Sequence, residues 1–183
     1  MKRFFLISAL LCAASTICIS QADAPKSKWA IEPSLTFPIE RIYMVNMAYN
    51  ICNKSEILFG FAFQNWENKN EKPIGKAHAY TLTAGYRYYI WKGLNAEIML
   101  FPAYNNFLSY VDNKWYNGFE SWIEYRIGYK IEWNINTAGF YLNIQPGIGH
   151  GLYLQHLWPD LNKKTMLKES IMFIPQIAFG IKL

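Results

Sequence analysis

The sequence predicts an all-β protein, an eight-stranded antiparallel up-and-down transmembrane β-barrel. Three observations predict this fold. Short segments in which large apolar residues alternate with small or polar ones recur along the chain, as in residues 57–64 (ILFGFAFQ). The links between these segments alternate between very short and long. The chain is rich in aromatic residues (17%) and poor in charged ones (17%, against about 25% in an average domain). Even so, beyond the N-terminus no apolar run approaches the roughly 20 residues that a spanning helix needs.

Successive side chains of a strand point to opposite faces, so the alternation locates the strands. We expect eight of them, at residues 29–37, 40–50, 56–66, 77–91, 94–105, 117–133, 138–152 and 169–183. The first strand has the weakest pattern, with Ile31 and Leu35 alternating with Glu32 and Ser34. If the first two segments formed one bent strand, the count would be seven. An up-and-down ring with both chain termini at the same end needs an even number of strands, so this topology would then be impossible.

The remaining strands each have one apolar face. In chain order these faces begin Tyr43, Val45, Met47; Ile57, Phe59, Phe61; Tyr80, Leu82, Ala84; Ala96, Ile98, Leu100; Ile123, Tyr125, Ile127; Phe140, Leu142, Ile144; and Ile171, Phe173, Ile177. The opposite faces carry the small, amide and charged residues. An Arg or Lys that faces lipid costs about 2–4 kcal/mol at the bilayer midplane, so we expect the polar faces to point into the barrel.

The connections assign the two ends of the barrel. Tight turns are expected at 52–55, 92–93 and 134–136, and long polar loops at 67–76, 106–116 and 157–168, while the first connection, near Pro38, is short. Outer-membrane barrels have short periplasmic turns and longer extracellular loops. Aromatic residues lie at both ends, as two interfacial belts would require: Trp29, Tyr49, Trp91 and Trp133 near the short turns, and Trp66, Tyr104, Trp115, Tyr116 and Phe119 near the long loops.

Residues 1–22 have the pattern of a secretory signal peptide, with Lys2 and Arg3 before a short apolar stretch. Cleavage after Ala22 would leave residues 23–183 as the barrel domain. An uncleaved N-terminal membrane anchor is the alternative. The formal net charge is +5, but the sequence contains no run of basic residues. We therefore expect no nucleic-acid partner.

With these features the chain resembles small eight-stranded bacterial outer-membrane barrels. The final segment, 177–183 (IAFGIKL), is similar to their C-terminal assembly signal but ends in Leu183, where that family usually has an aromatic residue. The resemblance implies a location in the bacterial outer membrane of a Gram-negative cell. It also implies outer-membrane lipid or lipopolysaccharide and the barrel assembly machinery as partners, and no cofactor.

Seven charged residues share the inward face: Arg87, Glu97, Glu120, Glu124, Arg126, Lys130 and Glu132. An eight-stranded barrel is just wide enough for side chains to fill it. We expect these charges to pair and plug the lumen. An ion pathway and an acid/base pair are the alternatives.

The three histidines, His78, His150 and His156, have no metal-ligand spacing, so no metal site is expected. His150 and His156 with Ser170 are the only candidates for a nucleophile and its base. No serine closely follows a histidine, as it does in outer-membrane lipid A deacylases.

Three prolines, Pro102, Pro146 and Pro175, interrupt strands at a similar height. Each removes a donor from the sheet. One hypothesis is a weakened seam that admits lipid laterally, similar to the proline-flanked gaps of outer-membrane lipid A palmitoyltransferases. Bulges or strand bends are the alternative.

Three functional hypotheses follow. The first is a non-catalytic structural or adhesive barrel that presents loop residues such as Trp115, Tyr116, Trp158 and Lys163. The second is a lipid-modifying enzyme that transfers or removes lipid A acyl chains, with lipid entry near Pro146 and Pro175. The third is a secreted lipocalin-like binding barrel, which requires the opposite facing, apolar inside and polar outside.

Overall fold

The computed structural model describes residues 28–67, 75–135, 138–155 and 171–183. The expected signal peptide and its cleavage site lie outside these residues. Among the described residues no helix is long and apolar enough to cross a membrane.

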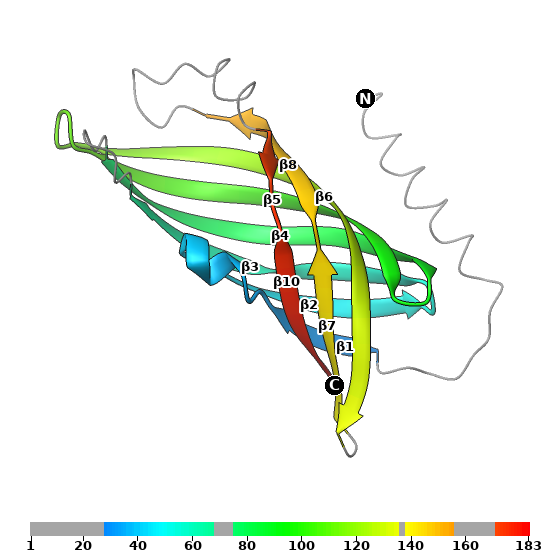
Figure 1. The fold of residues 1–183 in the computed structure, drawn as a ribbon. Coiled ribbons are helices and arrows are strands. Elements are labelled where there is room, and N and C mark those ends of the chain that lie inside the picture. Colours follow the sequence, from blue (N-terminus) through cyan, green and yellow to red (C-terminus); the bar gives the residue numbers. More distant parts are fainter. Residues whose placement is uncertain (1–27, 68–74, 136–137, 156–170) are drawn as a thin grey trace.

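The described residues form one antiparallel sheet and one short 3-10 helix, η2 (Phe37–Glu40). The strands are β1 (Trp29–Pro33), β2 (Ile42–Cys52), β3 (Ser55–Glu67), β4 (Gly75–Trp91), β5 (Leu94–Ser109), β6 (Trp115–Ile135), β7 (Ala138–Gln145), β8 (Gly147–Leu154), β9 (Met172–Phe173) and β10 (Gln176–Lys182). From β1 to β7 each strand pairs with the next along the chain, and β10 pairs with both β7 and β1, so the sheet closes on itself (Figure 1).

The closed sheet is a ring of eight strands. The halves β7 and β8 both pair with β6, so they are one strand interrupted at Pro146. Similarly, β10 pairs with β7 and β9 with β8, so β9 and β10 are the two halves of the last strand. Because β1 and β2 are separate and antiparallel, the predicted count of eight and the up-and-down order are confirmed for the part of the chain that the structure describes.

The first strand is shorter than the sequence pattern predicts. It ends at Pro33 rather than at residue 37. Beyond it, a single bridge joins Ser34 to Ala178, and the Ser34 amide donates to the Met44 carbonyl at 3.0 Å. Pro38 then occupies the start of η2, where its fixed φ favours the helical turn. Phe37 at this point is only 7% exposed, so the segment bends inward and buries its aromatic ring instead of continuing the strand.

The second long loop is also shorter than predicted. Strand β5 continues to Ser109 and β6 begins at Trp115, so only residues 110–114 connect them. The hydroxyl of Tyr116 and the amide of Lys114 both donate to the Asp112 carboxylate. The Tyr116 bond is the main cause that holds the pKa of Asp112 below its ordinary value. The turn at Lys92 and Gly93 is as short as predicted, whereas the third long loop, 157–168, lies outside the described residues.

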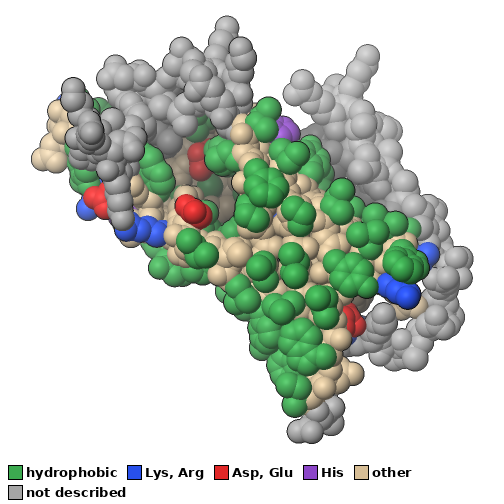
Figure 2. All heavy atoms as spheres, in the orientation of Figure 1, with side chains coloured by type: hydrophobic (Ala, Val, Ile, Leu, Met, Phe, Trp, Pro, Cys, Tyr) green, Lys and Arg blue, Asp and Glu red, His purple; other side chains and the backbone are tan. Residues whose placement is uncertain are grey.

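The side chains face as the alternation predicts. The exposed set on the ring includes Val45, Phe59, Phe61, Leu82, Leu100, Ile127, Ile131, Ile144 and Ile148, whereas the interior holds Arg87, Glu97, Arg126, Asn143 and Gln145. Figure 2 shows apolar side chains covering the face over β7 and β10. An apolar exterior around a charged interior is the inverse of a soluble protein.

Inward-facing glycines make room for bulky neighbours. Gly180 of β10 pairs with Tyr141 of β7. A Cβ at this glycine would lie 1.9–2.3 Å from atoms of the Tyr141 ring. The ring therefore lies flat across the glycine, and the interior accommodates it only because no side chain is present there.

We expect Gly180→Ala to lower the free energy of unfolding by about 1–3 kcal/mol, since the added methyl group overpacks the interior. Denaturant titration of the purified chain measures this. Gly139→Ala on β7 is the matched control, because its Cβ meets the flexible Lys182 side chain at 2.9 Å, which can move away. Equal losses in the two variants would contradict the packing of Tyr141 on Gly180.

Candidate functional site

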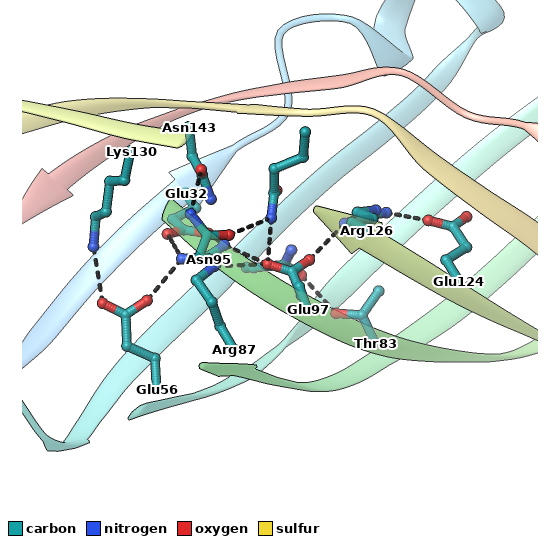
Figure 3. A network of polar contacts seen from close by, with 12 residues as sticks. Glu32, Glu56, Thr83, Arg87, Asn95, Glu97, Glu124, Arg126, Lys130 and Asn143 are labelled. Carbon is teal, nitrogen blue, oxygen red and sulfur yellow. Dashed lines mark hydrogen bonds and ion pairs between the residues drawn. The ribbon is translucent and has the colours of Figure 1, made fainter. Parts of the chain in front are cut away.

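The centre of the interior is the Arg87 guanidinium on β4. Its Nη1 and Nη2 donate to the two carboxylate oxygens of Glu32 at 2.7 and 2.9 Å, the geometry of a bidentate pair. Nη1 also donates to Glu56 at 2.7 Å, and Nε donates to Glu97 at 2.7 Å. Four residues from β1, β3, β4 and β5 therefore meet at one point of the lumen (Figure 3).

A second arginine extends the network along the ring. Arg126 of β6 donates through Nη1 to Glu97 at 2.8 Å, and through Nη2 to Glu124. Glu97 thus bridges two guanidinium groups. All three side chains are buried, so the charges of this interior are compensated by one another and not by water.

A third cation lies toward the short turns. Lys130 of β6 donates to Glu56 and to the hydroxyl of Tyr89, both at 2.8 Å. Nearby, Lys182 donates to Glu132 at 2.7 Å. A pocket of about 210 Å³ opens here, and it is lined by Asn50, Asn53, Glu56, Tyr89, Lys92, Gly93, Lys130, Glu132 and Lys182.

Amide side chains and a tyrosine complete the polar interior. Gln145 donates to Glu97 at 2.9 Å, and Asn95 donates to Asn143 at 3.1 Å. The Tyr141 hydroxyl donates to Glu32. These neutral groups extend the hydrogen bonding of the ionic centre from strand to strand, which makes the network a continuous layer across the lumen.

An apolar layer adjoins the polar one toward the long-loop end. Phe37, Met44 and Phe101 are buried there in one cluster, and Trp122 and Ile174 pack against it. The Arg126 guanidinium lies 5.7 Å from the centroids of both the Phe37 and Phe101 rings. These cation–π contacts join the two layers.

The predicted lumen network is largely present. Arg87, Glu97, Glu124, Arg126 and Lys130 are buried and joined by ion pairs. Glu132 is a half-exposed member at the short-turn rim, with Lys182 and Lys130 as partners. Glu120 has the inward parity, opposite Ala103 and Leu154, but it is only half-buried, lies nearer the long-loop end and belongs to none of the ion pairs that join described residues.

Two central acids were missed. Glu32 and Glu56 both contact Arg87. Each occupies a position whose side chain points into the ring. Glu32 lies between Ile31 and Pro33, and Glu56 directly precedes the outward-facing Ile57. Parity could have identified Glu56. Glu32 lies on the strand with the weakest alternation, where the sequence signal is low.

The central carboxylates are all engaged by cations. Glu32, Glu56, Glu97 and Glu124 each accept a hydrogen bond from a cation, so none is poised as a general base. No group of three or more His, Cys, Asp or Glu side chains in the described ranges could hold a metal ion. Around Arg87 the buried charges of the described residues compensate one another.

Hydrogen bonds span the strand breaks at Pro146 and Pro175. Both prolines interrupt their strands, as predicted. The amide of Ile174 nevertheless donates to the Gly147 carbonyl at 2.8 Å. On the other side, the Thr36 hydroxyl donates to the Pro175 carbonyl at 3.2 Å and accepts from the amide of Ile177 at 3.1 Å. Side-chain and backbone bonds thus replace the bonds that the prolines remove.

Pro102 does not interrupt its strand. Strand β5 passes through it, and Pro102 pairs with Ser121 of β6 in unbroken register. Only the pairing with β4 has a gap, between the pairs Thr81–Ala103 and Ala84–Leu100. The prediction of an interruption was wrong here because a proline removes donation toward one neighbour and leaves the other edge intact.

Of the candidate nucleophile and base residues, only His150 lies within the described part of the chain. His150 of β8 stacks on the outward-facing Tyr125 at 5.9 Å between ring centroids, on the exterior of the ring. His156 and Ser170 lie outside the described residues, as do the loop residues Trp158 and Lys163. Trp115 and Tyr116, expected in a loop, belong to the start of β6.

We expect Arg87→Met to lower the free energy of unfolding by about 3–5 kcal/mol, because it leaves three buried carboxylates without their shared cation. Denaturant titration measures the loss. Glu132→Gln is the control: this rim carboxylate is 40% exposed, and its ion pairs should contribute no more than about 1 kcal/mol. Adding Glu32→Gln to Arg87→Met should recover part of the loss. An Arg87→Met variant as stable as the parent chain would contradict the central role of this cation.

We expect Thr36→Val to speed exchange of the Ile177 amide about tenfold, since one hydrogen bond to this amide is lost. Hydrogen exchange read by NMR measures it. The Ile174 amide is the internal control, because its bond to Gly147 does not involve Thr36. If both amides exchange in the parent chain as fast as those of residues 110–114, the seam is open and the bridging bonds do not form.

No protein-family model matches the chain, and no curated protein or solved structure is similar to it.

Proposed function

We propose that this protein spans a bacterial outer membrane as an eight-stranded barrel with a plugged lumen, and that its role is structural or adhesive and not catalytic. The observation that carries the proposal is the facing of the ring. Large apolar side chains are exposed outside while arginines, lysines and glutamates are buried inside. Lipid favours this distribution, whereas water would oppose it.

The length of the apolar face supports a membrane span. On β4 the outward side chains between Tyr80 and Ile90 are apolar or aromatic, and the inward ones include Thr81, Thr83 and Arg87. This stretch has eleven residues. A tilted transmembrane strand needs about 9–11 residues.

The turns orient the barrel in the membrane. Two-residue turns connect β2 to β3 and β4 to β5 at one end, where the amide of Leu183 also bonds to the Trp29 carbonyl at 2.9 Å. The longer connections lie at the other end. By analogy with outer-membrane barrels, the short-turn end would face the periplasm and the other end the outside.

The filled interior argues against transport. The ionic layer around Arg87 and the apolar layer around Phe37 adjoin along the lumen, where Arg126 contacts both Phe37 and Phe101. Neither layer offers an acid, base or nucleophile free to react, which disfavours the lipid-modifying enzyme. The lipocalin-like alternative needs an apolar interior and a polar exterior, the opposite of the observed facing.

Fractionation of cells that express the full chain tests the proposal. We expect the protein in the outer-membrane fraction, released only by detergent, and running faster on a gel when unheated because the closed sheet resists unfolding. Recovery in the periplasmic or culture fluid without detergent would overturn the proposal.

The same preparation, reconstituted in a planar bilayer, should show no ion conductance above that of the lipid alone. An open outer-membrane porin in the same bilayer is the control. A stable conductance from the purified chain would contradict a plugged lumen and would favour an ion pathway.

A further inference from the structure

The outer surface of β3, β4, β5 and β6 changes character in successive rows toward the long-loop end. The register of these four strands places side chains from each strand side by side in a row. In the middle of the strands the outward rows are apolar, with Phe61 opposite Leu82 and, one row lower, Ala84 opposite Leu100. Two distinct rows follow above them.

The first of these, the aromatic row, contains Phe63, Tyr80, Tyr104 and Phe119. These four residues pair directly across consecutive strands. Tyr80 and Tyr104 are nearly half exposed, at 46% and 47%, and the Phe63 and Tyr80 rings lie 5.3 Å apart. A continuous row of aromatic side chains is typical of the membrane–water interface.

The second, the polar row, contains Asn65, His78, Asn106 and Asn117, again paired directly across the four strands. This row lies two residues beyond the aromatic row on every strand. The apolar rows below it carry no such set of amides. Each amide can donate two hydrogen bonds and accept two more.

Aromatic rings border the polar row on both sides. The His78 imidazole stacks on Phe63 of the aromatic row, with 6.1 Å between centroids and 11° between planes. On the other side it stacks on Trp115, at 6.4 Å and 22°. Trp115 is 55% exposed. Amide groups beside an exposed aromatic side chain such as Trp115 match a sugar, because hydroxyls bond to amides while the apolar face of the sugar ring packs on an aromatic side chain.

We propose that the polar row, with Trp115, binds the sugar headgroup of a glycolipid in the outer leaflet. This proposal rests on the proposed function, since the membrane is what sets the row at headgroup level, directly above the aromatic row. Three of its four members are neutral amides, which suit hydroxyl groups. A site for a phosphate group would instead be rich in Arg and Lys, which bind phosphate more strongly, so the row suits the sugar hydroxyls of the headgroup.

Binding of purified lipopolysaccharide to the full chain in detergent micelles tests this proposal, with calorimetry as the readout. We expect the double variant Asn106→Leu with Asn117→Leu to bind about tenfold or more weakly, because two hydrogen-bonding side chains become apolar. Asn134→Leu is the matched control, since it changes the same residue type at the other end of β6. The double variant Asn106→Gln with Asn117→Gln, which keeps the amides, should retain most of the binding.

Each remaining outcome would overturn the proposal. Equal affinity of the parent chain and the leucine double variant would place the glycolipid elsewhere, and no binding by the parent chain would exclude it. Equal affinity for the delipidated oligosaccharide would indicate a soluble glycan instead. Outer-membrane fractionation and gel mobility of each variant are measured in parallel. A parent chain that is membrane-embedded but binds no glycolipid defeats this inference alone, whereas a soluble parent chain defeats the proposed function.

Discussion

The structure depends on one buried cation that has more partners than its own strand can supply. Arg87 bonds to carboxylates from β1, β3 and β5, so it can be satisfied only when the first strand closes against the rest of the sheet. Glu32 is the critical partner, because β1 has five residues and the weakest sequence pattern of the ring. A strand this short makes few backbone hydrogen bonds. Inside the ring it is held by the bidentate ion pair of Glu32 with Arg87 and by the hydrogen bond from the Tyr141 hydroxyl to Glu32.

This constraint explains why the two halves of the ring are built differently. Where β1 pairs with β10, the wall is continuous and its interior is ionic. Beyond Leu35, whose amide still donates to the Ile177 carbonyl, the chain leaves the sheet, and the Thr36 hydroxyl accepts the bond from the Ile177 amide that a longer strand would have made. Phe37 then fills the lumen at this height. The loss of backbone pairing and the change from a polar to an apolar interior therefore have one origin, the early end of the first strand.

Much of this fold could be predicted because a single physical rule, alternation, sets the facing of every residue in a strand. It located all eight strands and placed Arg87, Glu97 and Arg126 inside. What escaped prediction depends on contacts across the ring. The end of β1, the extension of β5 and β6 toward residues 110–114, and the passage of β5 through Pro102 are decided by neighbouring strands. Glu56 shows the limit most clearly: its parity was visible, but its role follows only from Arg87 lying opposite.

In the proposed barrel, the ionic layer and the apolar layer would obstruct the lumen independently of each other. Ions passing along the lumen would meet the ionic layer, where every fixed charge has a partner, and then the apolar layer of Phe37, Met44 and Phe101, where there is nothing to replace their water. Weakening the ion pairs destabilises the ring without removing the aromatic rings beyond them. Conduction would require the loss of both layers. Loss of the ionic layer alone would already release β1 from its ion pair with Arg87. Under the proposed function, the same side chains that hold the sheet closed would also obstruct ions, so a stable wall and a lumen that does not conduct would have one cause.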